Sequence, residues 1–105
     1  MQFISAIDLH DSIKKGNHFK IIDVREPYEY EACNIGSQHI PMGDIPERVE
    51  DLPKDINIVI MCRSGKRAEA VANLLVTDYS LTNVYCLDGG ILAWKEHIDN
   101  TLDID

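Results

Sequence analysis

The segment Asn57-Ile-Val-Ile-Met-Cys-Arg-Ser-Gly-Lys-Arg-Ala68 decides the fold of this chain. Its first part, from Asn57 to Met61, is a near-continuous apolar run, which is typical of a strand buried on both faces of a parallel sheet. After the residues from Cys62 to Arg67, apolar side chains recur at helical spacing as far as the neighbourhood of Thr77. We therefore predict a strand, a tight turn and a helix, with Cys62 at the start of the turn.

Short strands and helices are predicted to alternate on both sides of this unit. Ser5, with Asp8 three residues later, is typical of a helix start, and Lys14-Lys15-Gly16 is typical of a helix end. The other predicted strands cover 20–24, 38–40 and 84–87, and the other predicted helices cover 26–32, 44–52 and 91–97. This alternation implies an α/β fold in three layers, with a central parallel sheet of about five short strands and helices on both faces. Ligands of such sheets bind beyond the carboxyl ends of the strands, which is where Cys62 is expected.

Length and composition indicate one small domain. The chain has 105 residues, of which 45% are hydrophobic, 10 are Lys or Arg and 18 are Asp or Glu. A domain of this size buries roughly two thirds of the surface that its unfolded chain exposes, which leaves no room for separate cofactor and substrate domains. A Rossmann dehydrogenase is therefore excluded, and we expect a single domain over 1–99 with a short acidic tail over 100–105.

The net charge of -8 argues against nucleic acid and anionic membranes as partners, because binding to either depends on many Lys and Arg side chains. Against this acidic background one basic cluster stands out, formed by Arg63, Lys66 and Arg67. A local concentration of positive charge in an acidic protein indicates a site for an anion.

The chain also lacks the signals of membrane insertion and export. Its longest apolar run, Ile56 to Met61, is far shorter than the roughly 20 residues that a bilayer span needs. The N-terminus has neither the basic region nor the long apolar region of a signal peptide, so a cytoplasmic location is expected. Cys33, Cys62 and Cys86 form no Cys-x-x-Cys pair and no metal-binding pattern, which indicates reduced thiols and no metal site.

Cys62 is the strongest candidate for a reactive residue. If the loop from Cys62 to Arg67 curls around the sulfur, backbone N–H groups and the positive end of the next helix point at it. These donors and the basic cluster should lower the pKa of the thiol below its free value of about 8.5. Gly65 permits the backbone angle that such a ring needs. The alternative is a small buried cysteine beside a basic helix start, but cations at a helix N-terminus are unfavourable unless an anion or a thiolate lies among them.

A Cys-His catalytic pair is not indicated. The four histidines, His10, His18, His39 and His97, fall on or beside other predicted elements, and only His39 ends a strand from which it could approach the loop. A papain-like protease is also excluded by the length of the chain. The chemistry must therefore depend on a thiolate that is activated electrostatically.

Four groups of residues occur in an order that carries a family resemblance. They are Asp23-Val24-Arg25-Glu26-Pro27 with Tyr28-Glu29-Tyr30-Glu31, Ile40-Pro41, the segment from Cys62 to Ala68, and Leu87-Asp88-Gly89-Gly90 with Trp94. In this order the chain resembles single-domain rhodaneses, the thiosulfate sulfurtransferases. The resemblance covers nearly the whole chain and implies a rhodanese-like three-layer fold.

The resemblance implies that Cys62 is catalytic. It would take a sulfane sulfur from thiosulfate or a persulfide donor, become a persulfide, and pass the sulfur to a thiophilic acceptor such as cyanide or a thiol. The N–H donors of the loop would stabilise the charge on the terminal sulfur, as an oxyanion hole does. The loop residues that would bind the substrate are Arg63, Ser64, Gly65, Lys66 and Arg67, with Arg67 or Lys66 orienting an anionic donor. No metal or organic cofactor is implied.

By the same resemblance, Asp23 and Arg25 lie at a strand end and hold the loop through hydrogen bonds. The alternative is a surface ion pair, which would contribute about 0 to 1 kcal/mol. Gly89-Gly90 are interpreted as a tight turn from a strand into a helix.

One segment departs from the usual family pattern of Gly-His-Ile, Gly-Ala and Ile-Pro. Here Cys33-Asn34 replaces the Gly and His, and the segment is a residue shorter. A similar variant occurs in rhodanese domains attached to E1-like adenylyltransferases, which implies a sulfur-relay protein as an acceptor. Cys33 is either a resolving thiol or a buried inert cysteine.

The alternatives to a sulfurtransferase are a phosphatase or arsenate reductase, a binding module and a redox sensor. Tyrosine phosphatases and arsenate reductases share this type of fold, but the phosphatases need a Cys-x5-Arg ring around phosphate, whereas Cys62 and Arg67 close a smaller Cys-x4-Arg ring. A rhodanese-like domain can also serve as a non-catalytic binding module. A third alternative is a redox sensor, because an exposed thiolate of low pKa is readily oxidised.

Overall fold

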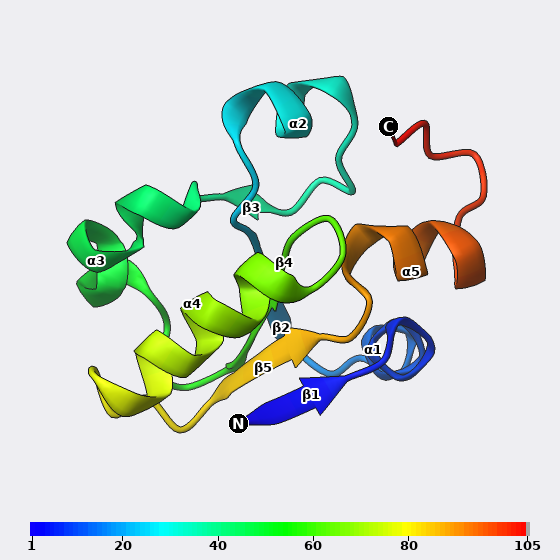
Figure 1. Cartoon of the computed structure of the whole chain (residues 1–105). Coiled ribbons are helices and arrows are strands. Elements are labelled where there is room, and N and C mark those ends of the chain that lie inside the picture. The colour runs from blue at the N-terminus through cyan, green and yellow to red at the C-terminus, as the bar shows by residue number, and fades with distance from the viewer. Residues whose placement is uncertain (105) are drawn as a thin grey trace.

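The computed structural model describes residues 1–104, in which strands alternate with helices along the chain (Figure 1). The elements in chain order are β1 (Gln2–Ile4), α1 (Ala6–Lys14), β2 (Phe19–Asp23), α2 (Pro27–Ala32), β3 (Gln38–His39), α3 (Ile45–Arg48), β4 (Asn57–Met61), α4 (Lys66–Thr77), β5 (Val84–Leu87) and α5 (Gly90–His97). Two short 3-10 turns, Met42–Asp44 and Val49–Asp51, flank α3. The α/β alternation predicted from the sequence is confirmed.

The strands form one sheet of five in the order β1-β5-β4-β2-β3, and every pair of neighbours is parallel. β4 lies in the middle of the sheet, between β2 and β5, as its apolar sequence predicts. Its side chains from 58 to 61 are all 0% exposed. Cys62 therefore follows the central strand at the carboxyl edge of the sheet.

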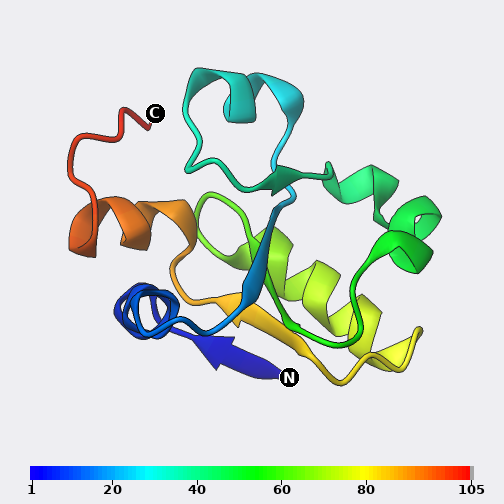
Figure 2. The same cartoon turned by 180° about the vertical axis from the view of Figure 1, so that it is seen from behind.

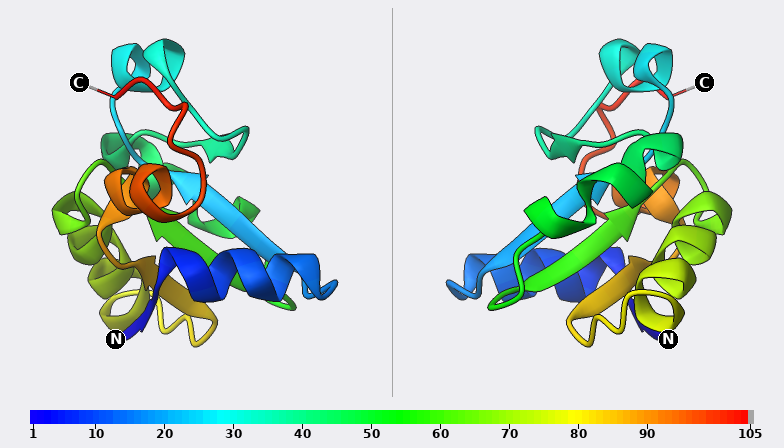
Figure 3. Two further views of the ribbon diagram at one scale, coloured as in Figure 1. Left: turned by 90° about the vertical axis from the view of Figure 1, so that its right-hand side faces the viewer. Right: turned by 90° about the vertical axis from the view of Figure 1, so that its left-hand side faces the viewer.

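Helices cover both faces of the sheet (Figure 3). On one face Ile58 and Ile60 of β4 belong to an apolar cluster with residues of α3 and α4. On the other face Val59 and Met61 belong to a second cluster with residues of α1 and α5. The alternation follows from the strand geometry, in which successive side chains point to opposite faces.

The ends of α1 follow the sequence signals. Ser5 is the N-cap, and its side chain accepts a 3.0 Å hydrogen bond from the N–H of Asp8. Gly16 follows the helix with a φ of +91°, a conformation that favours glycine.

Two expectations differ from the structure. The sequence analysis assigned no strand at the N-terminus, but β1 pairs with β5 at the edge of the sheet. The single helix predicted over 44–52 is wrong, because only Ile45–Arg48 is α-helical and a 3-10 turn follows it. Arg48, at φ -112° and ψ 4°, leaves the helical conformation and divides the segment.

The C-terminal segment lies against the domain. Leu102 and Ile104 are half-buried and pack on the cluster shared by α1 and α5. Asp105, the last residue of the predicted tail, lies outside the described residues. Among residues 1–104, none of the helices has the length and apolar character required to span a bilayer.

α2 covers neither face of the sheet and stands beyond the carboxyl ends of the strands (Figures 1 and 2). It has no buried residue, so a core does not hold it in place. A buried ion pair at the end of β2 does this instead. Arg25 donates to both carboxylate oxygens of Asp23 at 2.8 to 3.1 Å, and its Nη2 donates to the carbonyl of Cys33, just after α2, at 2.6 Å. The alternative of a surface pair is wrong, because Asp23 is 0% and Arg25 2% exposed.

We expect Asp23→Ala to lower the free energy of unfolding by about 3–5 kcal/mol, because it leaves the guanidinium of Arg25 buried without its counter-charge. Urea denaturation measures this change. The matched control is Asp51→Ala, which removes the carboxylate of the exposed Arg48–Asp51 pair and should cost less than about 1 kcal/mol. Equal losses in the two variants would contradict the role of the buried pair.

Candidate active site

Cys62 lies between the end of β4 and the start of α4, with its side chain directed into the loop that joins them. Its sulfur accepts hydrogen bonds from the backbone N–H of Gly65 at 3.1 Å and of Ala68 at 3.3 Å. Cys62 is only 1% exposed, so the loop surrounds most of the sulfur. The site can therefore stabilise negative charge on the sulfur and admits only a narrow reactant.

The loop is shorter than the sequence analysis expected, because α4 begins at Lys66. Gly65 is the N-cap, and its φ of +111° is a conformation that few other residues adopt. Lys66 and Arg67 therefore belong to the first turn of α4. The helix directs its N-terminal N–H groups toward the sulfur, as the bond from Ala68 shows.

The start of α5 holds the same loop from its other side. The N–H of Ile91 donates to the carbonyl of Cys62 at 2.8 Å, and the N–H of Leu92 donates to the carbonyl of Arg63 at 3.1 Å. Gly90 makes this approach possible, since a Cβ there would lie 2.5 Å from both carbonyl oxygens. The prediction of a tight turn at Gly89-Gly90 is confirmed by φ values of +77° and +62°. Contact with the Cys62 loop is an additional constraint on Gly90.

Cys86 supports the loop from β5, and the sequence analysis did not single it out. Its buried thiol lies 3.8 Å from the carbonyl oxygen of Gly65, to which it can donate a weak hydrogen bond. Burial, together with the nearby Cys62, raises the pKa of the Cys86 thiol to about 11. Cys86 therefore stays protonated at neutral pH and is an inert support.

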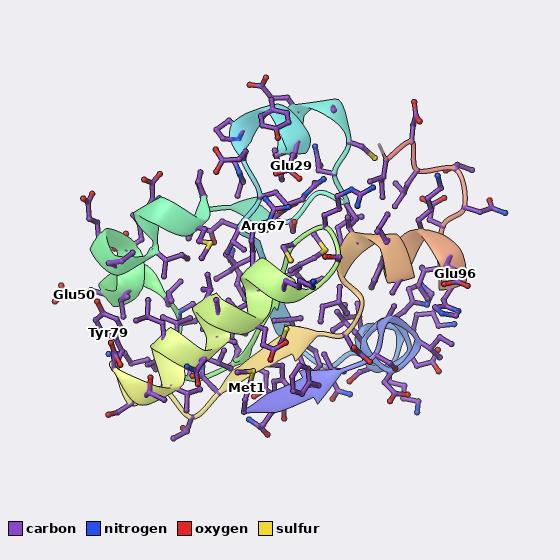
Figure 4. The ribbon with its side chains drawn as sticks, in the orientation of Figure 1. Met1, Glu29, Glu50, Arg67, Tyr79 and Glu96 are labelled. Atoms are coloured by element: carbon purple, nitrogen blue, oxygen red, sulfur yellow. The ribbon has the colours of Figure 1, made fainter. Side chains whose placement is uncertain are left out.

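Arg67 forms a two-bond ion pair with Glu29 of α2. Nη1 lies 2.6 Å from Oε1 and Nη2 lies 3.0 Å from Oε2. Figure 4 shows Glu29 of α2 and Arg67 of α4 lying close together, so the pair connects α2 to the start of α4. The hydrogen bond from Arg67 is the main reason that the pKa of Glu29 falls to about 2, and the carboxylate in turn raises the pKa of Arg67.

Glu29 was not predicted to belong to the site, because a glutamate in the first turn of a short helix after Pro27 indicates only a helix cap. It does cap α2: Glu29 Oε1 accepts a 3.0 Å bond from the N–H of Glu26. Its second role requires α4, which is distant in the sequence. The other basic loop residues differ in exposure, with Lys66 exposed and Arg63 half-buried.

A pocket of about 180 Å³ opens beside the loop, between α2 and the C-terminal segment. Its walls include Tyr28, Ala32 and Cys33 from the α2 region, Arg63 from the loop, and Ile104. Cys33 is half-buried. The lining includes Arg63, the residue that follows Cys62, and it combines apolar side chains with charged side chains of both signs.

His39 is held away from catalytic use in this arrangement. Its Nε2 lies 2.7 Å from the carbonyl oxygen of Arg25, to which it can only donate, and its ring stacks on Tyr30 at 4.5 Å. Within residues 1–104, His, Cys, Asp and Glu side chains form no cluster of three or more that is suited to a metal ion. The assignment of the loop residues to substrate binding stays a prediction, as does that of Asp23 and Arg25 to holding the loop, since the bond from Arg25 beyond Asp23 goes to the carbonyl of Cys33.

Comparison with known proteins identifies related domains. The family model described as a rhodanese-like domain matches residues 5–97. A protein named sulfurtransferase from Allochromatium vinosum is 40% identical over 79 residues, which are 73% of this chain and 72% of that protein. The thiosulfate sulfurtransferase GlpE of Tolumonas auensis is 29% identical over 71% of each chain. The crystal structure of a rhodanese-related protein from Thermoplasma volcanium superposes with a TM-score of 0.82 at 30% identity, covering 93% of this chain and 94% of that one.

Gly90→Ala should displace the Cys62 loop, because the new methyl group meets two carbonyl oxygens and the positive φ is unfavourable for alanine. The backbone strain alone should lower the free energy of unfolding by about 1–3 kcal/mol. Amide hydrogen exchange at Ile91 and Leu92 should accelerate as their bonds to the loop are lost. The control is Gly16→Ala, at φ +91° with open space around it, which should leave both amides protected. Unchanged protection in Gly90→Ala would contradict this account.

The Glu29–Arg67 pair should make stability depend on acidic pH. Because the pKa of Glu29 is lowered from 4.5 to about 2, its contribution is complete above pH 4.5 and is lost as pH falls toward 2. We therefore expect the difference in unfolding free energy between the wild type and Glu29→Gln to shrink as the pH falls through this range. Urea denaturation at several pH values measures it, and a difference that does not change with pH would disprove the assignment.

Proposed function

Since this chain belongs to the rhodanese-like domain family, we propose that Cys62 carries a sulfane sulfur, as a persulfide, from a donor to a thiophilic acceptor. The family match and the sulfurtransferase relative identify the chain as a rhodanese-type sulfurtransferase. The proposal of a Cys62 persulfide rests on the two backbone N–H groups, from Gly65 and Ala68, that are directed at the sulfur of Cys62.

In the first step the thiolate of Cys62 attacks the outer sulfur of the donor. With thiosulfate, a new S–S bond forms, the S–S bond of thiosulfate breaks, and sulfite leaves with the bonding electron pair. Cys62–S⁻ and S₂O₃²⁻ thus become Cys62–S–S⁻ and SO₃²⁻, with atoms and charge conserved. No external oxidant is needed, because the donor sulfur already has the oxidation level of a persulfide.

The loop then stabilises the intermediate. The terminal sulfur lies one S–S bond further from the backbone of Cys62 than the thiolate did, and it needs donors for its negative charge. The N–H groups at the start of α4 provide them without reorganisation, because Gly65 and the α5 contacts already fix the loop. The preformed loop is therefore the source of catalysis in this proposal.

In the second step an acceptor attacks the terminal sulfur. Cyanide would give thiocyanate, and a thiolate R–S⁻ would give R–S–S⁻, while Cys62 leaves as the thiolate in both cases. Because Cys62 is 1% exposed, the attacking atom must stand at the end of a narrow group. A cysteine thiol of a sulfur-relay protein is accessible enough only if it lies on a projecting segment.

The direct test is the intact mass of the purified protein before and after incubation with thiosulfate or with a small-molecule persulfide, and again after cyanide. We expect a gain of one sulfur atom that cyanide removes. Cys62→Ser should show no gain, because a hydroxyl is not ionised near neutral pH. The matched controls are Cys33→Ser and Cys86→Ser, which should still be loaded at Cys62. A cyanide-labile sulfur that persists in Cys62→Ser would reject the assignment.

A further inference from the structure

We propose that Glu29 determines the donor preference of this enzyme by occupying Arg67, so that the preferred donor is the persulfide of a small thiol and not thiosulfate. This inference rests on the proposed function, since it concerns the donor that loads Cys62.

The geometry leaves the charge of Arg67 engaged. Both terminal nitrogens of its guanidinium bind the carboxylate of Glu29, one to each oxygen, at 2.6 and 3.0 Å. Such two-bond pairs are among the strongest charge-assisted hydrogen bonds. Glu29 is also fixed from its own helix by the N–H of Glu26. With Glu29 13% and Arg67 34% exposed, the pair is only partly open to solvent.

Arg67 is one of the two side chains, with Lys66, that are expected to orient an anionic donor, so thiosulfate would compete with Glu29 for it. Arg67 directly precedes Ala68, whose N–H donates to the sulfur of Cys62. The backbone of Arg67 therefore lies next to the reactive sulfur. A dianion that used the same two N–H donors of Arg67 would have to displace the carboxylate of Glu29, and one that bound the other donors would lie beside its negative charge. Binding of thiosulfate is therefore weakened, because thiosulfate brings two negative charges to Arg67, where Glu29 already supplies one.

An organic persulfide meets a different environment. Its sulfur atoms carry at most one negative charge, and its organic group needs a place to lie. The pocket beside the loop provides one, with the apolar side chains of Tyr28, Ala32 and Ile104 within about 180 Å³. The charged side chains on its walls are of both signs, since Arg25 and Arg63 line it together with Glu29 and Asp103. This volume fits a small thiol compound.

The loading step with such a donor is balanced. Cys62–S⁻ attacks the terminal sulfur of R–S–S–H, the S–S bond of the donor breaks, and R–S⁻ leaves with the electron pair. The products are Cys62–S–S–H and R–S⁻, so the sulfane sulfur moves without a change in the overall oxidation state.

Glu29→Gln separates this role of Glu29 from its role in capping α2. Glutamine at the same position can still accept the N–H of Glu26, because capping boxes use Glu or Gln there. The variant removes the negative charge and one strong acceptor for Arg67, so the guanidinium becomes available to an anion. The matched control is Glu31→Gln, the same change at an exposed position of α2.

The experiment measures the second-order rate of Cys62 persulfide formation by intact mass, with thiosulfate and with the persulfide of 2-mercaptoethanol, whose organic group is small and uncharged, as the two donors. In the wild type we expect the persulfide to react faster. In Glu29→Gln we expect the rate with thiosulfate to rise on the order of tenfold while the rate with the persulfide changes less than about twofold. Glu31→Gln should match the wild type, and the gain should vanish in Glu29→Gln/Arg67→Gln, because Arg67 mediates it.

The inference is overturned if Glu29→Gln and Glu31→Gln have the same ratio of donor rates, or if the wild type prefers thiosulfate. It is also overturned if the thiosulfate gain persists without Arg67. These results leave the proposed function intact, because Cys62 is still loaded. If neither donor loads Cys62 in the wild type, the proposed function itself fails and this inference with it. Thermal unfolding of each variant shows that the compared proteins are folded.

Discussion

The hydrogen bonding of one short backbone segment is the constraint on which the rest of the site depends. The sulfur of Cys62 accepts N–H groups from Gly65 and the start of α4, while the carbonyls of Cys62 and Arg63 accept N–H groups from the start of α5. Two helix N-termini thus hold the loop from opposite sides. Their N–H groups have no partner within their own helices, so they are available for this purpose. The charge-stabilising geometry is therefore present before any substrate arrives.

α2 has no buried residue, and it is held by charged contacts together with Tyr30, whose ring stacks on His39 and whose hydroxyl donates to the carbonyl of Ser37. The buried Asp23–Arg25 pair holds the C-terminal end of α2 through the carbonyl of Cys33. Glu29 connects α2 to Arg67 of α4. The same contacts that position α2 also determine how much positive charge the mouth presents, so structure and donor preference are linked through Glu29.

Much of the fold could be predicted because its signals are local. The apolar run from Asn57 to Met61 defines the central strand, and the cap at Ser5 defines the start of α1. β1 was missed because a three-residue edge strand has too few side chains for a pattern. The helix expected over 44–52 was wrong because Asp44 and Pro46 are signals of where a helix starts and do not show the break at Arg48. The family was also predictable, because its motifs occur in order along almost the whole chain.

By itself the sequence determined the α/β alternation, the placement of Cys62 after the central strand, and the need for glycine at position 65, since each depends on residues close together in the chain. Only the tertiary structure decided that Arg67 is paired with Glu29, that Cys86 lies behind Gly65, and that Gly90 touches the Cys62 loop. These contacts join residues of separate elements, which become neighbours only when the sheet is assembled. The electrostatics of the site therefore depend on packing, whereas the reactive residue is specified by local sequence.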